Sequence, residues 1–306
     1  MASITSMSPA AAEKSSQTGL LAGLAAYLIW GFLPLVFKLL EGVPAATIVA
    51  DRTIWSLLLV GAMLLLAGRT AEIRAALADR ATLRSMLISS VLLAGNWLVY
   101  VWAVESGQVL EASFGYFINP LANIAIGMVV LGERHNRWQL VSIAIAVVAI
   151  GIQAVGVGGV PYIALSLAIS FAAYGYFRKT ARVSSTTGLF VETLLLLPLA
   201  AGYLGFTFLR DGGVGPHADP FLMGMLLVTG PATAVPLLFF AFAVRRLRLT
   251  TIGMLQYLAP SIAFVLAITV FGEALNPMRL VSFGLIWFSL LVYSVDSYVR
   301  MRNRPV

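Results

Sequence analysis

Ten long apolar segments, separated by short charged or Gly/Pro-rich stretches, limit the folds open to this sequence of 306 residues. Each holds about 18–24 residues, and at about 1.5 Å of rise per residue a helix of that length crosses the roughly 30 Å of hydrocarbon in a bilayer. Because lipid offers the backbone no hydrogen bonds, helices are the expected spanning form. We therefore predict an all-α integral membrane protein with ten transmembrane helices. The predicted spans are 19–40, 44–67, 84–105, 110–131, 137–157, 160–178, 187–209, 221–244, 250–271 and 277–298.

The composition agrees with this fold class and excludes several kinds of site. Hydrophobic residues make up 60% of the chain and charged residues 11%, where a soluble domain is about half apolar and about a quarter charged. The absence of cysteine rules out disulfides, iron–sulfur clusters and thiol chemistry. With two histidines in the chain, we expect no metal site. Residues 1–18 are small and polar and lack the layout of a cleaved signal, which predicts a disordered cytoplasmic tail.

Lysine and arginine are distributed unevenly between the two sides that the ten spans define. If the N-terminus is cytoplasmic, 16 of the 20 basic residues lie on the cytoplasmic side, Lys38, Arg210 and Arg279 lie outside, and Arg52 lies within a span. Because the loops are short, this asymmetry is a strong positive-inside signal. It predicts that both termini are cytoplasmic, with a basic tail at 299–306, and it explains the net charge of +7 without nucleic-acid binding.

The two halves of the chain repeat each other at a constant offset in the sequence. The stretch YFINPLANIAIGMVVLGERHN begins at Tyr116 and QYLAPSIAFVLAITVFGEALN begins at Gln256, and both carry a central proline and end in G-E-x-x-N. The repeat unit holds five spans, with boundaries at 19–158 (helices 1–5) and 159–298 (helices 6–10). Because five is odd, the second unit enters the membrane from the opposite side. Two inverted halves are typical of secondary transporters, although a duplicated membrane scaffold would leave the same pattern.

Pro120 and Pro260 occupy equivalent places near the middle of the fourth and the ninth predicted span. A proline inside a helix removes one hydrogen bond and frees the carbonyl four residues earlier, here that of Tyr116 or Gln256. The kinks are either moving hinges whose carbonyls face a wet cavity, or static bends that fit helix packing, and the sequence leaves both open. The hinge or kink candidates are Pro34, Pro120, Pro236 and Pro260.

Polar and aromatic side chains at mid-depth are candidates for a substrate cavity. Buried amides in lipid find partners, often across helices, so each is either a link between helices or part of a cavity wall. Together these side chains suit a cavity with aromatic walls and a few amides that binds a small amphipathic solute. The candidates are Tyr27, Trp30, Asn96, Tyr100, Tyr116, Asn119, Asn123, Tyr174, Gln256 and Tyr257.

Three charged residues lie within predicted spans, namely Asp51, Arg52 and Glu192. An ionisable group at depth is costly and is a functional hypothesis by default, and proton coupling would need such a carboxylate. They lie near span ends, however, so we expect structural pairing or snorkelling. Adjacent helix positions point about 100° apart, so Asp51 and Arg52 are not expected to pair with each other. Lys38 could pair with Glu41 or Asp51.

A G-E-x-x-N motif follows the fourth and the ninth predicted span. The macrodipole disfavours a glutamate at the C-terminal end of a helix, so Glu133 and Glu273 are expected to pair with a neighbouring arginine or to cap an adjacent helix. Asn136 and Asn276 are typical N-caps of the next helix, and Pro277 suits its first position. The motif is therefore predicted to be a tight helix–turn–helix connector, with a gating role as the alternative.

The segment GLLAGLAAYLIWGFLPLVFKLLEGVPAATIVADRTIWS (Gly19 to Ser56), together with the two G-E endings, resembles the drug/metabolite transporter superfamily and, within it, the EamA-domain proteins of the RarD-type branch. The resemblance covers nearly the whole chain. It implies ten helices in two inverted halves, a central cavity lined mainly by helices 1, 3, 4, 6, 8 and 9, and export of small metabolites, amino acids or hydrophobic drugs. Ala-Asp-Arg at 50–52 departs from the branch, which carries a histidine before the arginine, so a proton-linked histidine is not expected there.

The sequence contains no H-E-x-x-H, Walker or G-x-S-x-G motif and no cluster of catalytic carboxylates. We therefore predict no enzyme activity, no catalytic residues, no cofactor and no use of ATP.

The predicted function is secondary active export of amino acids or similar small amphipathic metabolites across the bacterial inner membrane by alternating access. A hydrophobic-drug exporter is the alternative within transport, and a lipid enzyme or a passive channel is an alternative of another class. The expected partners are a small-molecule substrate and membrane lipid, without nucleic acid, and a monomer is expected. The exact substrate, the coupling ion and the net direction are not specified by the sequence.

Overall fold

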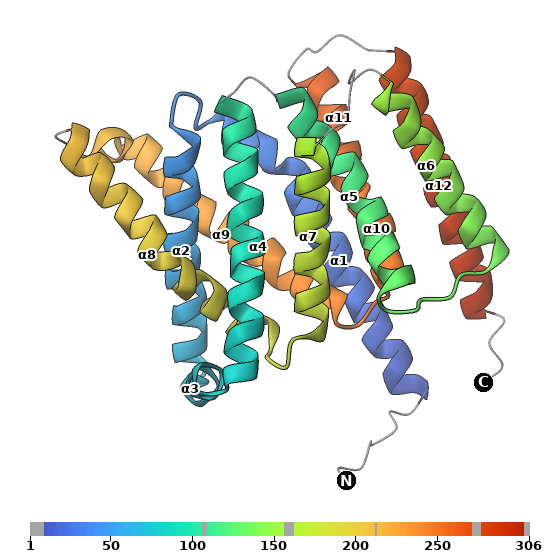
Figure 1. The fold of residues 1–306 in the computed structure, drawn as a ribbon, viewed down its shortest axis with the longest axis horizontal. Helices are drawn as coiled ribbons and strands as arrows, with labels where there is room; N and C mark the ends of the chain where they lie inside the picture. The colour runs from blue at the N-terminus through green and yellow to red at the C-terminus, as the bar shows by residue number, and fades with distance from the viewer. Residues whose placement is uncertain (1–8, 106–108, 156–161, 212, 271–276, 303–306) are drawn as a thin grey trace.

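The computed structural model describes residues 9–105, 109–155, 162–211, 213–270 and 277–302, and these residues are helical apart from their turns (Figure 1). This confirms the all-α fold class. The described helices are α1 (Pro9–Lys38), α2 (Ala45–Leu66), α3 (Thr70–Ala78), α4 (Arg80–Glu105), α5 (Val109–Val129), α6 (Arg137–Ala154), α7 (Tyr162–Thr180), α8 (Ser185–Asp211), the short 3₁₀ helix η1 (Gly215–Ala218), α9 (Pro220–Val244), α10 (Leu249–Gln256), α11 (Leu258–Thr269) and α12 (Pro277–Arg302).

Seven helical stretches within the described residues are long and apolar enough to cross a membrane. They are Lys14–Lys38, Ala45–Leu66, Arg80–Tyr100, Ser185–Asp211, Pro220–Val244, Leu249–Leu266 and Leu280–Arg300. Two shorter apolar stretches, Phe114–Val129 and Arg137–Ile152, accompany them. The chain is therefore a multi-pass membrane protein. Each predicted span coincides with a helix, with α10 and α11 sharing the ninth, while the number of ten crossings stays a prediction.

The helix bounds differ from the predicted spans at three places. α1 begins at Pro9, so residues 9–18, which were predicted to be a disordered tail, are helical. α3 is a short, mostly exposed helix between α2 and α4, and a search for long apolar runs does not detect such a helix. The ninth span is divided at Tyr257, where α10 ends and α11 begins.

The four candidate prolines have different effects on their helices. Pro34, Pro120 and Pro236 lie inside α1, α5 and α9, and each of these helices continues past its proline. Pro260, in contrast, lies just after the break at Tyr257. Because Pro260 has no N–H to offer the carbonyl four residues earlier, the break falls where a hydrogen bond is missing. The two repeat prolines thus have unlike surroundings, and whether either one moves stays a prediction.

Four helix starts in the first half of the chain have counterparts in the second half at the offset that separates Tyr116 from Gln256. This offset relates α2 to α8, α4 to α9, α5 to α10 and α6 to α12. Related helices run in opposite directions in Figure 1, where α2 descends from the upper end of the molecule and α8 rises toward it. The pair of α6 and α12 forms one edge of the molecule (Figure 1), while α1 packs on α9 and α4 on α7 in the interior.

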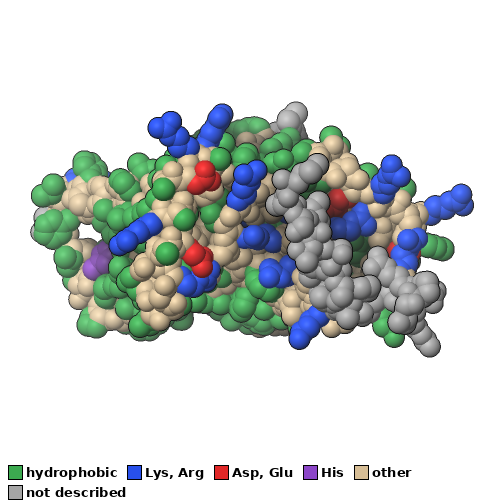
Figure 2. All heavy atoms as spheres, turned by 90° about the horizontal axis from the view of Figure 1, so that it is seen from below, with side chains coloured by type: hydrophobic (Ala, Val, Ile, Leu, Met, Phe, Trp, Pro, Cys, Tyr) green, Lys and Arg blue, Asp and Glu red, His purple; other side chains and the backbone are tan. Residues whose placement is uncertain are grey.

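The lower end of the molecule in Figure 1 carries many of the basic residues. Figure 2 shows this end from below, with Lys and Arg side chains spread across it. α1 begins and α12 ends at this end, and α3 lies there (Figure 1). The connections at this end carry Arg69 before α3, Arg134 after α5, Arg182 after α7 and Arg246 after α9. This is the face that the distribution of lysine and arginine predicts to be cytoplasmic.

The first G-E-x-x-N motif forms a tight connector between α5 and α6, as predicted. Gly132 has a φ of 64°, in the left-handed region that favours glycine, and it turns the chain after α5. The Glu133 carboxylate then accepts hydrogen bonds from the backbone N–H groups of Leu249 (2.7 Å) and Thr250 (3.1 Å) and lies 3.6 Å from Nε of Arg248. A carboxylate at the start of α10 is favoured by the helix dipole, so Glu133 both caps a helix and pairs with an arginine.

Asn136 caps the start of α6. Its Oδ1 accepts a hydrogen bond from the backbone N–H of Gln139 at 2.9 Å, and Gln139 Oε1 accepts one from the backbone N–H of Asn136 at 3.4 Å. This reciprocal pair is a capping box. Pro277 is the first residue of α12, as predicted, whereas Glu273 and Asn276 of the second motif lie outside the described residues.

Candidate functional site

Five aromatic rings meet between α1, α7 and α9, and we call them the aromatic cluster: Tyr27, Trp30, Phe171, Tyr174 and Phe240. The ring centroids are 5.4 Å apart for Tyr27 and Trp30, 6.0 Å for Trp30 and Phe171, and 5.4 Å for Phe171 and Phe240. Tyr174 stacks on Phe240 at 6.0 Å. These separations are favourable for aromatic pairs. Three of the predicted cavity residues are thus brought together. The two phenylalanines were not predicted, because sequence alone does not distinguish a ring in the interior from one that faces lipid.

Several predicted cavity residues carry buried polar atoms that have no hydrogen-bond partner in the described part of the chain. These atoms are the hydroxyls of Tyr27 and Tyr257 and the Oδ1 atoms of Asn119 and Asn123. Asn123 also donates from Nδ2 to Gln256 Oε1 at 2.7 Å, which joins α5 to α10. A buried polar atom left unpaired costs about 1–3 kcal/mol. Such atoms call for a partner, and a bound ligand or water can provide it.

Three further predicted residues lie on α4 and α5. Asn96 donates from Nδ2 to the carbonyl of Leu167 and to the hydroxyl of Ser170, both at 2.9 Å, so it links α4 to α7. Tyr100 of α4 and Tyr116 of α5 lie edge to face with ring centroids 6.0 Å apart. Tyr116 is 49% exposed, whereas Asn96 is used in helix packing.

Glu192 in α8 is fully buried and forms an ion pair with Arg178 at the end of α7. Arg178 Nη1 lies 3.5 Å from Glu192 Oε1. The hydroxyls of Ser89 and Tyr174 also donate to this carboxylate, so the pair contacts the aromatic cluster through Tyr174. Gly188 makes room for the guanidinium, since a Cβ there would overlap Arg178. This is the structural pairing expected for Glu192, but its partner was missed because a basic residue at a span end is explained equally well by topology.

Asp51 in α2 is held by His217 and Trp55. Its Oδ2 lies 2.8 Å from His217 Nε2, and its Oδ1 accepts a hydrogen bond from Trp55 Nε1 at 3.2 Å. His217 belongs to η1 in the connection between α8 and α9. Asp51 therefore ties this connection to α2 through His217, and the pairing of Lys38 with Glu41 or Asp51 stays a prediction.

Arg52 follows Asp51 in the sequence but contacts a different set of residues. Its Nε donates to the hydroxyl of Thr233 in α9 at 2.9 Å, and its Cζ lies 4.5 Å from the centre of the Trp97 ring in α4. Tyr100 and Tyr116 lie within electrostatic range of the guanidinium. Arg52 is therefore held in α2 by residues of α4 and α9, which fits the structural alternative of the two that were expected for it. We call Arg52 with these four residues the arginine cluster.

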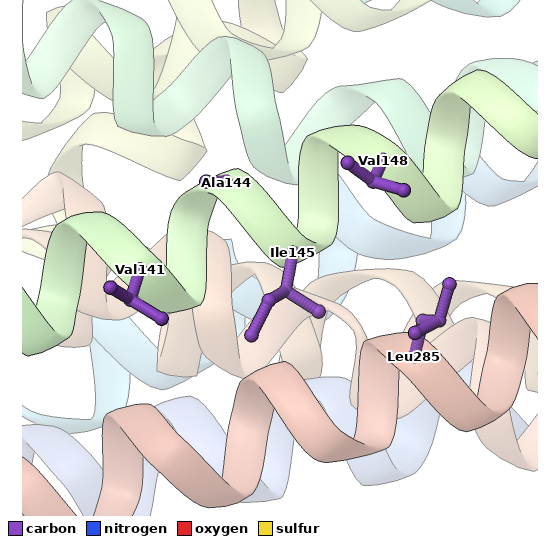
Figure 3. A pocket seen from close by; sticks show the side chains of 5 residues that line it. All are labelled: Val141, Ala144, Ile145, Val148 and Leu285. Carbon is purple, nitrogen blue, oxygen red and sulfur yellow. The ribbon is translucent and has the colours of Figure 1, made fainter.

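A groove on the edge of the molecule between α6 and α12 has a different character (Figure 3). Its volume is about 270 Å³, and its lining residues are Val141, Ala144, Ile145, Val148 and Leu285. All of these side chains are apolar, so the groove suits lipid chains and has no polar group to orient a solute. The aromatic and arginine clusters in the interior are therefore the stronger candidates for a functional site.

Comparison with known proteins places these residues in a family context. The model of the EamA-like transporter family matches residues 17–154. The chain is 41% identical to protein RarD of Salmonella typhimurium, covering 95% of this chain and 99% of that one. It is 42% identical to an uncharacterised transporter of Pseudomonas aeruginosa, covering 96% and 99%. A solved crystal structure at 20% identity is similar in fold, with a TM-score of 0.71 over 94% of this chain and 99% of that one.

Proposed function

The chain belongs to the RarD-type branch of the drug/metabolite transporter superfamily, and on this premise we propose that it is a secondary active transporter that exports amino acids or similar small amphipathic metabolites. The family makes it a membrane transporter, and the substrate, the direction and the mechanism are our proposal. A small amphipathic solute needs apolar walls for its side chain and a few polar groups for its head. The aromatic cluster and the amides of α5 supply groups of both kinds.

The proposed substrate class rests on one observation, which is that unpaired polar atoms lie close to the aromatic cluster. Asn123 Oδ1 lies 3.3 Å and Phe240 Cζ lies 3.4 Å from the point that a Cβ on Gly175 would occupy. The ring of Tyr27, whose hydroxyl has no partner among the described residues, lies 6.4 Å from the ring of Phe240. An amide oxygen and the ring of Tyr27 therefore border the same aromatic ring, and in our proposal the solute contacts all three.

We further propose ten membrane crossings in two inverted halves, 19–158 and 159–298. The constant offset between the starts of related helices and the opposite directions of α2 and α8 support this arrangement (Figure 1). Two such halves can exchange conformations and so open first to one side and then to the other. The helix that corresponds to α5 in the second half is broken at Tyr257, whereas α5 itself is continuous. Such a difference between equivalent helices is expected when the two ends of the molecule are not equally open. The basic lower face in Figure 2 supports a cytoplasmic assignment for that end and the bacterial inner membrane as location.

Proteoliposomes that contain the purified protein test this proposal. Vesicles are loaded with unlabelled amino acids, and the entry of each labelled amino acid is followed as counterflow. We expect saturable counterflow of at least one amino acid above that of empty vesicles. Transport of cationic or neutral drugs without any amino acid would replace this proposal by drug export, and flux without counterflow would identify a channel.

A matched pair of tryptophan variants tests whether transport depends on the aromatic cluster in the interior of the molecule. Trp30→Leu removes a ring from the aromatic cluster and should lower counterflow strongly. Trp138→Leu removes a ring that is 63% exposed on α6 and should leave counterflow unchanged. Equal effects of the two changes on counterflow would show that transport does not depend on the aromatic cluster.

A further inference from the structure

We propose that Arg52 binds the carboxylate of the transported solute, an inference that rests on the proposed transport function and names the chemical group the site requires. The first argument is its missing counter-ion. Among the Asp and Glu residues whose side chains the structure describes, a set that does not include Glu105, Glu111 or Glu273, none lies within 4.0 Å of the Arg52 guanidinium nitrogens. Its neighbour Asp51 is engaged by His217 and Trp55. A cation within a spanning helix and without a counter-ion is costly, and this cost points to a function.

The equivalent position in the second half of the chain makes the missing counter-ion clearer. Glu192 corresponds to Arg52 in the repeat, because it lies as far from the start of α8 as Arg52 lies from the start of α2. Glu192 has a counter-ion in Arg178, which itself corresponds to Lys38. The second half thus places a cation and an anion at these two positions, and the first half places two cations. The position equivalent to Arg178 therefore supplies no counter-ion for Arg52, and in our proposal the solute supplies it.

The contacts of Arg52 hold the guanidinium and leave part of it free. Thr233 takes the Nε hydrogen and Trp97 lies against the guanidinium face. No hydrogen bond joins the two Nη groups to any residue whose side chain the structure describes. A planar guanidinium with free Nη groups matches the two oxygens of a carboxylate. Arg52 is partly exposed, so a solute can approach it.

The surroundings of the free Nη groups suit the rest of an amphipathic solute. Tyr100 and Tyr116 lie edge to face with each other and within electrostatic range of Arg52. A carboxylate bound to Arg52 would therefore have its apolar part beside these rings. A neutral or cationic drug lacks the group that pairs with Arg52, which distinguishes this inference from the drug-export alternative.

Ligand-dependent thermal unfolding of the purified protein in detergent tests the inference without relying on transport. The probes are L-phenylalanine, 3-phenylpropionate and the primary amides of both. We expect the carboxylates to raise the unfolding temperature of the wild-type protein and the amides to have no effect. Arg52→Gln should weaken the binding of carboxylates about 10- to 100-fold, the size expected for a hydrogen bond to a charged group.

Two further variants separate carboxylate binding from folding and from general charge. Arg52→Lys keeps the positive charge but loses the paired Nη groups, so it should fold and bind with intermediate affinity. Arg210→Gln removes an exposed arginine at the end of α8 and should bind as the wild-type protein does. Equal binding of acids and amides, equal weakening of both by Arg52→Gln, or no stabilisation by either carboxylate would overturn the inference.

Counterflow in proteoliposomes distinguishes failure of this inference from failure of the proposed function. Amino-acid counterflow with an unchanged half-saturation concentration in Arg52→Gln would leave the proposed function standing and overturn the role of Arg52. Binding of 3-phenylpropionate that depends on Arg52, without counterflow of any amino acid, would keep the carboxylate site and overturn amino-acid export.

Discussion

Arg178 at the end of α7 and Glu192 in α8 form an ion pair whose side chains are 1% and 0% exposed, with 3.5 Å between Nη1 and Oε1. Ser89 in α4 donates to the same carboxylate, so three helices meet at this pair. The desolvation cost of a buried ion pair largely offsets its Coulomb attraction, so the pair is weak evidence for stability by itself. Loss of one partner is different, because the other charge stays buried alone.

The variant Glu192→Ala should therefore lower the free energy of unfolding by about 3–5 kcal/mol. The measurement is unfolding in mixed detergent micelles, followed by circular dichroism. The double variant Arg178→Met, Glu192→Met should recover most of the loss, since no lone charge remains. A single variant as stable as the wild-type protein would show that the pair does not form.

Glu72 in α3 gives a prediction for low pH outside the membrane spans. Its carboxylate accepts hydrogen bonds from Arg69 at 2.6 Å and from Thr187 at the start of α8 at 2.9 Å. These contacts, that with Arg69 above all, lower the pKa of the Glu72 carboxyl to about 2. The unfolded value is about 4.3, so this stabilisation is present above about pH 4.3 and is lost as the pH falls toward about 2.

We therefore expect α3 to separate from α8 in that pH window. Amide hydrogen exchange of residues 70–78, corrected for its intrinsic pH dependence, should become faster there. The variant Glu72→Gln should remove the pH step, because its side chain does not titrate. The same corrected exchange at pH 7 and pH 2.5 in the wild-type protein would contradict the prediction.

Gly230 in α9 lies against Trp55 in α2 and sets the distance between these helices. A Cβ at position 230 would overlap the Trp55 side chain and lie 2.8 Å from its carbonyl carbon, and Ser56 donates to the Gly230 carbonyl at 3.1 Å. Gly230→Ala should therefore cost about 1–3 kcal/mol of stability through overpacking. Gly224→Ala on the same helix meets no atom within 4 Å, so the better helix propensity of alanine should make it neutral or stabilising. Equal unfolding curves for the two variants would contradict the close contact.

The positions of the helices could be predicted from the sequence because the hydrocarbon thickness sets the length of a spanning helix. Charged or Gly/Pro-rich stretches mark where each helix ends. The connector at Gly132 and Glu133 could be predicted as well, because a glycine turn and a carboxylate at a helix end follow local rules. The different outcomes at Pro120 and Pro260 could not, since the local motifs are alike. The two prolines have different tertiary surroundings: α10 approaches Pro120 so closely that a Cβ on Gly253 would lie 2.5 Å from the Pro120 carbonyl oxygen.

Candidate residues could be proposed from the sequence only where a side chain within a span carries a polar group, as the amides of Asn119 and Asn123 do. Tyr27, Trp30 and Tyr174 were proposed in this way, whereas Phe171 and Phe240, which pack against them, carry no such signal. The direction of a side chain such as Arg52 depends on the rotation of α2 about its axis. That rotation is set by close contacts with α9, and a sequence pattern does not predict it.

Pro260→Ala tests whether the break at Tyr257 moves during transport, on the basis of the proposed function. Alanine restores an N–H that can bond the Gln256 carbonyl, so α10 and α11 should become one helix. If the break is a hinge, the counterflow rate should fall several-fold with little change in the unfolding temperature. Pro120→Ala is the matched control and should have the smaller effect, because α5 is already continuous. An unchanged counterflow rate for Pro260→Ala would make the break a static bend.

The hydroxyl of Tyr27 predicts opposite effects on stability and on transport. It is buried and has no hydrogen-bond partner in the described part of the chain, while its ring contacts Trp30 and Phe240. Tyr27→Phe keeps these ring contacts and removes the unpaired hydroxyl, so the free energy of unfolding without solute should rise by up to about 1–3 kcal/mol. Counterflow of amino acids should weaken at the same time, because the solute loses a polar contact.

The variant Tyr298→Phe serves as its control, since this ring on α12 is 60% exposed and should change neither stability nor counterflow. Unfolding in detergent micelles and counterflow in proteoliposomes, measured on the same preparations, give the two readouts. A loss of stability in Tyr27→Phe would mean that the hydroxyl already has a partner in the resting protein. In that case it would be part of the helix packing, and the polar side of the site would have to come from Asn119 and Asn123 instead.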